Sequence, residues 1–550
     1  MKFAAFALAF ASIFAGNAPG QTPTVGGLLN NYSFILPGLP SYGIARGSIF
    51  DIFGTNLSSS TTLLQGPRLQ TTLNGVTINV MVNGTTTNPL FYFESPTQIA
   101  AILPSATPVG TGTITVTTGA GTSAAFPIQV VESAFGLLTT NNGSGPVAGF
   151  DASNNGVFLG FSAAANPGDI LELWGTGLGP VQADAAGVAV TDPIEVDIGG
   201  ISAAVLYHGR SSYAGLDQIN VKVPSGVSGC YVSMAVVTGS YVSNFGTLPV
   251  AVSGRTCSDS FNPIISASNL DKISQTGAVS IGVISLSEVT APGTTVAGVT
   301  VNGATGDLGF ATFARGTSAQ FNAGAYAGGG AGSPSVGSCL VNFYSASTGS
   351  SIPPPAFTFT NLNAGPEINI NGPDGALAMP IDSVGSSSFY VTPIGATSFI
   401  PASGGSFTFD NGSGGPDVGT FTAQLQMPSP VTWSNLDTIS MVTRSNGLTV
   451  NWSGGDLNTY VSIAGLSFGS VNGSTSDFVV GGFTCQAPTS AGTFTVPPLV
   501  LLSLPHSSLG LSTSSLLVSN VSAPVSFAAQ GLDVGFLEAI VEKAILVTYQ

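Results

Sequence analysis

Only two histidines occur in the 550 residues, which limits the acid–base chemistry open to this chain. His208 is followed by Ser211, Ser212 and Asp217, the residue types of a Ser–His–Asp hydrolase, whereas His506 lies far along the sequence. The stretch around His208 lacks the Gly-x-Ser-x-Gly turn that exposes the nucleophile in α/β-hydrolases. Because the four neighbouring residues fall in or beside one loop, we expect His208 to be a surface-loop histidine and not a catalytic base.

Paired carboxylates could instead support the hydrolysis of glycosidic bonds, with one acid and one base. The candidate glutamates are Glu94, Glu132, Glu172, Glu195, Glu367, Glu538 and Glu542. Glu172 and Glu195 fall at outward positions of alternating strands, where contact with solvent explains them. No two of these carboxylates share a pocket-like context, so the sequence predicts no catalytic residue.

One glycine-rich loop carries the oxygen ligands that calcium prefers. Asp410, Asn411 and Asp417 lie close together in "DNGSGGPD", although their spacing differs from that of an EF-hand loop. Asp and Asn are also common turn residues, which explains the same letters without a metal. No phosphate-binding Gly-x-x-x-x-Gly-Lys motif is present. We therefore predict no metal and no cofactor, and leave calcium at Asp410 and Asp417 as an open alternative.

Aromatic residues on loops are the remaining indication of ligand binding. Tyr207 and Tyr213 flank a loop at 208–215, and "FYF" at 91–93 ends a hairpin. Aromatic rings at such positions can stack on sugars or contact protein partners. Most of them are expected to serve as packing.

The four cysteines, Cys230, Cys257, Cys339 and Cys485, favour two disulfides in an exported protein. The simplest pairing joins Cys230 to Cys257 and Cys339 to Cys485, although the sequence leaves three connectivities open. The first bridge would close a loop of roughly 28 residues, which stabilises by about 3–4 kcal/mol.

Charge and the N-terminus point to an extracellular location. Charged residues make up only 7% of the chain and the net charge is −16, which argues against binding to nucleic acid or to an anionic membrane surface. Lys2, an apolar stretch at residues 3–14 and small residues at 16–18 predict a signal peptide over 1–18. We expect a secreted or cell-surface protein without a membrane-spanning segment in the mature chain, or else a periplasmic one.

One phrase occurs twice in the first half of the chain. "RGSIFDIFGTNLSS" at 46–59 matches "PGDILELWGTGLGP" at 167–180, and "SPTQIAAILP" at 95–104 matches "GLDQINVKVP" at 215–224. Alternating apolar residues and turn residues follow each copy in the same order. The changes in spacing fall in loops, which indicates two homologous β-sandwich modules. After a linker at 19–30, these modules are predicted at 31–134 and 135–256.

The repeated phrase, together with the hairpins and the Gln-Ile pairs that follow it, resembles the opening of IPT/TIG-type Ig-like domains. In this arrangement the chain is similar to exported bacterial proteins that carry two such modules in tandem. The resemblance covers about residues 30 to 255. It implies Ig-like sandwiches that serve as binding or spacer modules. Arg46 departs from the pattern, because the second copy has Pro167 at that position.

The second half of the chain is also β-rich and is punctuated by Gly, Ser and Pro. We predict two further β units at 257–365 and 366–550, with one larger sandwich as the alternative. Trp433 and Trp452 are expected to anchor a core. The last residues, 536–550, are expected to form a hairpin that turns near residues 542–543, with a helix as the alternative.

Taken as a whole, the chain is predicted to be an all-β protein of tandem Ig-like sandwiches followed by further sandwich units. The predicted function is non-catalytic: extracellular adhesion, scaffolding or ligand binding, with a protein or glycan as the partner. The alternatives are a secreted polysaccharide-acting hydrolase with accessory Ig-like modules, and an array of carbohydrate-binding modules.

Overall fold

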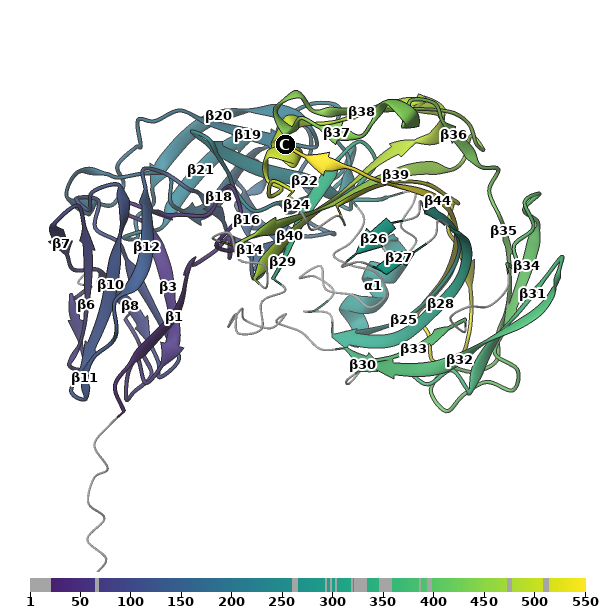
Figure 1. Ribbon diagram of the computed structural model, residues 1–550, viewed down its shortest axis with the longest axis horizontal. Coiled ribbons are helices and arrows are strands. Elements are labelled where there is room, and N and C mark those ends of the chain that lie inside the picture. The colour runs from purple at the N-terminus through teal and green to yellow at the C-terminus, as the bar shows by residue number, and fades with distance from the viewer. Residues whose placement is uncertain are drawn as a thin grey trace, which may run out of the picture.

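The all-β class predicted from the alternating strands is confirmed (Figure 1). The structure, a computed structural model, describes residues 21–64, 69–259, 266–291, 294–296, 299–301, 304–317, 320, 334–345, 359–384, 387–392, 398–471, 477–507 and 514–550. The helices α1 (Ala267–Thr276) and α3 (Pro498–Leu502) are short. The signal peptide predicted at 1–18 lies outside the described residues. Within the described ranges, no helix has the length and apolar character needed to cross a bilayer.

The first module is a sandwich of two sheets. One sheet has the order β1 (Thr24–Asn30), β3 (Ile49–Thr55), β9 (Gln98–Ile102), β8 (Leu90–Glu94) and β4 (Thr62–Leu63). The other has the order β2 (Ile44–Ala45), β12 (Phe126–Val131), β10 (Gly110–Thr118), β6 (Val76–Val82) and β5 (Thr72–Leu73). Phe50 and Ile52 of β3 face Ile78 and Val80 of β6 in a fully buried core.

The linker predicted at 19–30 is wrong from Thr24 onward. β1 pairs antiparallel with β3 and forms one edge of the first sheet. Two adjacent glycines in β1 interrupt its side-chain alternation, which hides the strand in the sequence.

The second module repeats these strands in one twelve-stranded sheet. Its main order is β14 (Thr139–Asn141), β15 (Ser144–Val147), β24 (Gly246–Val250), β22 (Gly229–Thr238), β19 (Ile194–Ile198), β20 (Ile201–Arg210), β21 (Asp217–Lys222), β18 (Ile170–Thr176), β16 (Gly149–Asp151) and β17 (Val157–Phe158). The repeated phrase forms the seven-residue strand β3 in one module and the seven-residue strand β18 in the other. Ser123 and Ser243 occupy equivalent turns, and the hydroxyl of each accepts a backbone N–H, from Val116 and Val236.

A proline explains why the first module has two separate sheets. Its second hairpin strand is broken into β7 (Thr85–Thr87) and β8, and Pro89, which has no N–H to donate, stands at the break. The second module has no proline at that point. Its ten-residue β20 pairs with β19 and then with β21, and so connects both faces of the sandwich.

The second half of the chain forms one curved fourteen-stranded sheet. The main order is β29 (Cys339–Ser345), β40 (Phe478–Pro488), β39 (Tyr460–Ser470), β42 (Ser515–Val521), β44 (Val534–Leu546), β25 (Ala278–Ala291), β28 (Ala304–Thr317), β33 (Ser387–Val391), β32 (Gly375–Val384), β31 (Glu367–Gly372), β34 (Ser406–Asp410) and β35 (Thr422–Gln426). The sheet curls, so that Phe313 of β28 and Leu537 of β44 share one core with Phe407 and Phe409 of β34 (Figure 1).

Two expectations for this half need correction. The predicted division at 365/366 runs through a single sheet. β25 pairs with β44, and both strands belong to the same sheet as β31 to β35. The hairpin predicted at 536–550 is also wrong, and so is the helix. β44 runs for 13 residues and pairs with β25 on one side and β42 on the other. Glu542 and Lys543, at which a turn was predicted, are paired with strands on both sides.

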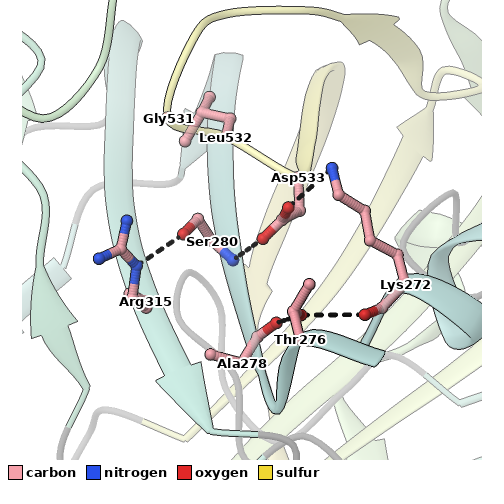
Figure 2. Close-up of a pocket in the computed structure, with 8 residues that line it drawn as sticks. All are labelled: Lys272, Thr276, Ala278, Ser280, Arg315, Gly531, Leu532 and Asp533. Carbon is pink, nitrogen blue, oxygen red and sulfur yellow. Dashed lines mark hydrogen bonds and ion pairs between the residues drawn. The ribbon is translucent and has the colours of Figure 1, made fainter. Parts of the chain in front are cut away.

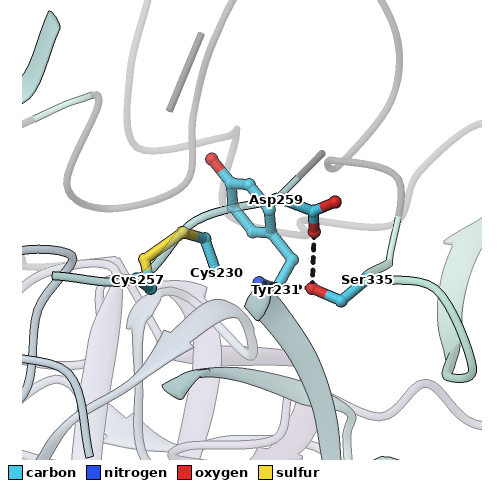
Figure 3. Close-up of a disulfide and its surroundings, with 5 residues drawn as sticks. All are labelled: Cys230, Tyr231, Cys257, Asp259 and Ser335. Carbon is cyan, nitrogen blue, oxygen red and sulfur yellow. Dashed lines mark hydrogen bonds between the residues drawn. A yellow bond between two sulfur atoms is a disulfide. The ribbon is translucent and has the colours of Figure 1, made fainter. Parts of the chain in front are cut away.

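The two disulfides follow the simplest pairing, Cys230–Cys257 and Cys339–Cys485, which is thereby confirmed. The second bridge links directly paired residues of β29 and β40. Beside the first bridge, the Ser335 hydroxyl donates to the Asp259 carboxylate at 2.7 Å and accepts the backbone N–H of the residue after Cys230 at 3.0 Å (Figure 3). The second module is therefore attached covalently and by hydrogen bonds to the chain that enters the large sheet.

A three-stranded sheet covers part of the large sheet. It consists of β36 (Val431–Trp433), β38 (Leu448–Gly454) and β41 (Thr493–Val496). Trp433 and Trp452 are both buried, so their predicted role as core anchors is confirmed. Ala235 and Phe245 of the second module belong to the same core, which packs the second module against the large sheet.

Candidate functional site

The residues of the possible hydrolase triad do not come together. His208 lies within β20 and not in a loop, and its Nε2 is 3.0 Å from a backbone carbonyl oxygen. The Ser211 hydroxyl accepts the backbone N–H of Tyr213, and Ser212 is exposed. Asp217 is fully buried and its carboxylate is bonded elsewhere. The arrangement places no nucleophile beside the histidine.

Asp217 instead forms the centre of a buried joint between the first two modules. Its carboxylate pairs with Arg210 and accepts the backbone N–H groups of Gly177 at 2.7 Å and Leu178 at 2.8 Å. The second terminal nitrogen of Arg210 donates to the carbonyl oxygen of Gly47 in the first module at 2.9 Å. Both charged side chains are at most 1% exposed. The turn of the repeated phrase in the second module is thus held against the first module.

Further hydrogen bonds extend this joint. The Thr176 hydroxyl accepts the backbone N–H of Ile49 at 2.8 Å, and Asn30 donates to the carbonyl oxygen of Thr176 at 3.1 Å. The Ser105 hydroxyl of the first module accepts the N–H of Val181 at 3.1 Å. Sequence reasoning missed the joint. Its only trace there is an Arg and an Asp seven residues apart in a chain with very few charges.

Most of the candidate glutamates occupy structural or exposed positions. Glu94 is buried and accepts hydrogen bonds from Ser60 and Asn74. Glu132 pairs with Arg46 on the surface. The other candidates outside β44, Glu172, Glu195 and Glu367, are half-buried or exposed on strands β18, β19 and β31.

Glu538 differs from the other candidate glutamates. Burial raises the pKa of its carboxyl to about 7. In the described part of the chain this carboxyl accepts no hydrogen bond, and Ser285 of β25 lies opposite it in the ladder. Glu542 shares its strand face four residues on, and a rise of ~3.3 Å per residue places the two Cα atoms about 13 Å apart. That spacing exceeds the ~5–10 Å between the carboxyl groups of glycosidases.

In the possible calcium loop, the oxygens serve the loop itself. Asp410 accepts hydrogen bonds from Asn369 at 2.8 Å and from a backbone N–H at 2.9 Å. Asp417 accepts the backbone N–H of Asn363 at 2.9 Å. The Asn411 amide bonds to backbone atoms on both sides of the loop. Across the described residues, no group of three or more His, Cys, Asp and Glu side chains is placed to hold a metal ion.

Two of the predicted aromatic residues, Tyr92 and Tyr213, lie at the junction of the first two modules. Tyr207 lies within β20 instead, and its hydroxyl donates to the carbonyl oxygen of Arg210 at 2.9 Å. Tyr92 packs against Ile49 and Ile102 on the outer face of the first sheet, and the residue after Tyr213 packs there too. Tyr213 itself is 63% exposed. Tyr32, which sequence reasoning missed, completes a group of three that we call the junction tyrosine cluster: Tyr32, Tyr92 and Tyr213.

The environment of the cluster favours the protonated phenol groups. Burial first, and then the proximity of Tyr213, raises the pKa of Tyr92. The pKa of Tyr32 is raised by burial and then by Tyr92 and Asp51. Asp51 lies beneath the cluster, where both of its carboxylate oxygens accept the Asn31 amide at 3.0 Å. Burial raises the pKa of Asp51 to about 6, although hydrogen bonds oppose the shift.

A pocket of about 460 Å³ opens where α1 meets the large sheet (Figure 2). Lys272 and Thr276 line it from α1, Ser280 from β25 and Arg315 from β28. Asp533, in the turn before β44, pairs with Lys272 at 2.8 Å and accepts the backbone N–H of Ser280 at 2.7 Å. Nothing in the sequence brings these residues together, because they come from four separate segments.

No known family model and no curated protein sequence matches the chain. Among solved structures, SGBP-B of a Bacteroides ovatus mixed-linkage glucan utilization locus, in complex with a mixed-linkage heptasaccharide, is 14% identical, with 45% of this chain and 56% of that chain covered and a TM-score of 0.19. SGBP-B from a Bacteroides uniformis xyloglucan utilization locus is 9% identical over 86% of this chain and 97% of that chain (TM-score 0.15). Tandem Ig domains of titin are 8% identical over 42% of this chain and 99% of that chain (TM-score 0.12). The fold of this chain is described by the strand pairing given above.

Proposed function

We propose that this protein is a non-catalytic extracellular binding protein that holds a neutral glycan at the junction tyrosine cluster. The observation that carries the proposal is the position of Tyr213. Its ring is 63% exposed, next to Tyr92, on a junction that buried hydrogen bonds hold in place. Exposed tyrosine rings combine an apolar face, which stacks on sugar rings, with a hydroxyl group that can hydrogen-bond.

Hydrogen bonds and packing hold the loop that carries Tyr213 in place. The Tyr213 backbone N–H donates to the Ser211 hydroxyl at 3.0 Å, and the Ser211 N–H donates to the carbonyl oxygen of Leu216 at 2.9 Å. Ala214 packs on the outer face of the first sheet. A loop fixed in this way loses little conformational entropy on binding, which favours affinity.

The charges around the cluster favour a neutral ligand. Asp51 and Asp217 are both fully buried, and both accept hydrogen bonds from neighbouring groups. The surface beside the three tyrosines therefore offers hydroxyl groups and aromatic rings but no exposed carboxylate from either residue. The net charge of −16 adds a repulsive field for acidic polysaccharides at low salt.

The test is the affinity of the mature chain for a panel of neutral polysaccharides, measured by calorimetry. Tyr213→Ala should weaken binding by about tenfold, equivalent to about 1.4 kcal/mol for the loss of one stacked ring. Phe158→Ala is the matched control, because Phe158 is an exposed aromatic residue of the same module, 47% exposed, and belongs to a different surface. It should leave the affinity unchanged.

Two outcomes would contradict the proposal. The first is a panel in which no neutral glycan binds, or in which Tyr213→Ala and Phe158→Ala bind equally well. The second is turnover of a polysaccharide that Glu538→Gln abolishes. That result would make the protein a hydrolase that uses the Glu538 carboxyl, whose pKa burial raises to about 7.

A further inference from the structure

We propose that the pocket between α1 and the large sheet is a second binding site, which takes a small carboxylate ligand on Arg315 and Lys272. This site is distinct from the junction tyrosine cluster in both position and ligand chemistry. The inference does not depend on the glycan proposal.

The size of the pocket suits a small molecule. Its volume of about 460 Å³ lies within the ~300–1,000 Å³ of typical ligand sites. Ala278, Gly531 and Leu532 form its uncharged lining, and charged side chains stand around them (Figure 2). A ligand with one charged end and an uncharged body fits this division.

Arg315 is held in position but is not neutralised. Its Nε donates to the Ser280 hydroxyl at 2.9 Å, which fixes the plane of the guanidinium group. In Figure 2 the two terminal nitrogens extend away from that bond. Throughout the described residues, no carboxylate lies within ion-pair distance of Arg315. The edge of the guanidinium that suits a bidentate acceptor is therefore available.

The other described arginines show how unusual this is in an acidic chain. Arg46, Arg210 and Arg255 each pair with at least one carboxylate. Arg444 is buried and bonds to backbone carbonyl oxygens and to His506. Of the five, Arg315 alone is exposed at a pocket without an anionic partner.

One carboxylate of the protein itself, that of Asp533, is bound in the pocket. Asp533 accepts from a backbone N–H and from the Lys272 ammonium group. This leaves Lys272 and Arg315, with charges of +2, against one carboxylate of −1. A second carboxylate, supplied by a ligand, would balance the charges. The planar fork of an arginine matches a carboxylate through two parallel hydrogen bonds, which favours a carboxylate over a single-atom anion.

A uronic acid is the natural probe, because it joins one carboxylate to an uncharged, hydroxylated ring. It could arrive as the free monosaccharide or at the end of an acidic polysaccharide. The two sources share the same chemistry. Glucuronate and an oligogalacturonide, titrated separately into the mature chain, distinguish them.

The experiment compares glucuronate with glucose and inorganic phosphate by calorimetry or by ligand-observed NMR. Wild-type protein should bind glucuronate, and any binding of glucose should not depend on Arg315. Arg315→Gln should reduce that affinity by at least about tenfold, as expected when charge-assisted hydrogen bonds are removed. Arg315→Lys should show an intermediate loss, because an ammonium cannot form the bidentate pair. Arg46→Gln is the control, because it removes an arginine that pairs with the exposed Glu132 outside the pocket. It should leave the affinity for glucuronate unchanged.

Several results would overturn the inference. They are the absence of glucuronate binding, equal binding by Arg315→Gln and wild type, and binding of phosphate without binding of glucuronate. The two proposed sites can fail separately. Arg315→Gln should leave neutral glycan binding unchanged, and Tyr213→Ala should leave glucuronate binding unchanged.

Discussion

The two copies of the repeated phrase build the same strand and turn but use the turn differently. In the first module, Thr55 and Asn56 are exposed at the free end of the sandwich. In the second, the equivalent Thr176 and Gly177 are buried against the first module. Local sequence therefore specifies the shape of the turn, while the residues opposite it decide whether the turn becomes a joint.

The decisive difference lies opposite the turn, at Thr97 and Asp217. In the first copy the residue opposite the turn contributes a backbone atom: the carbonyl oxygen of Thr97 accepts the N–H of Gly54 at 3.0 Å. In the second, the Asp217 carboxylate accepts two N–H groups of the turn and also holds Arg210, which reaches the first module. One buried ion pair thus converts a generic sandwich turn into a connection between modules.

Removing Asp217 should produce the largest loss of stability. Asp217→Ala leaves a buried arginine without its partner, which costs about 3–5 kcal/mol. Thr97→Ala, at the equivalent position of the first copy, should cost less than about 0.5 kcal/mol because that side chain is exposed. Unfolding in guanidinium, followed by tyrosine and tryptophan fluorescence, measures both variants.

A double variant sharpens this test. Arg210→Met combined with Asp217→Leu removes both charges, and it should recover part of the loss seen with Asp217→Ala. If Asp217→Ala and Thr97→Ala were equally mild, the joint would not be the feature that distinguishes the two copies.

The glycine that precedes both turns should show a similar requirement in the two modules. A Cβ on Gly175 would collide with the ring of Phe135, and a Cβ on Gly54 would collide with the carbonyl oxygen of Thr24. Gly175→Ala and Gly54→Ala should each cost about 2–3 kcal/mol of unfolding free energy, from overpacking. Gly160→Ala, where nothing lies within 4 Å of the added Cβ, should change the unfolding midpoint little. A tolerated Gly175→Ala would show that the turn does not need close backbone approach.

The smallest expected effect is on the pH dependence of the unfolding free energy, and it concerns the carboxylates within β3 and β18. Asp51 of the first copy is buried, with a pKa of about 6, whereas its counterpart Glu172 is half-buried. Between about pH 4 and pH 6 the folded state keeps the Asp51 proton while the unfolded state has lost it. Stability therefore falls as the pH rises through this window and then levels off.

Asp51→Asn should remove this fall in the unfolding free energy, which amounts to about 2 kcal/mol or less between pH 4 and pH 6. Glu172→Gln should leave the fall unchanged. Thermal unfolding at a series of pH values from 4 to 8 provides the comparison. A profile that Asp51→Asn leaves unchanged would mean that the carboxyl titrates normally in the folded protein.

The repeat and the strands were predictable because they depend on local patterns. Alternating side chains identified β6 and β19, and the duplicated phrase located β3 and β18. The large sheet was not predictable, because its central pairing joins residues as distant as Ile281 and Val534. No local pattern reports a parallel contact across half the chain.

The same reason limits the prediction of the sites. Tyr213 stood out in the sequence as an aromatic residue on a loop, but Tyr32 joins it only because the two modules meet there. The Arg210–Asp217 joint depends on a carbonyl oxygen contributed by the other module. The pocket at Lys272, Arg315 and Asp533 depends on the pairing of β25 with both β28 and β44.

Hydrogen–deuterium exchange of the mature chain, with and without a neutral oligosaccharide that binds it, tests the central claim most directly. Binding at the junction tyrosine cluster predicts added protection in the peptides that contain Tyr32, Tyr92 and Tyr213, and no change in the large sheet. Protection confined to residues 266–550, with the junction peptides unchanged, would contradict it.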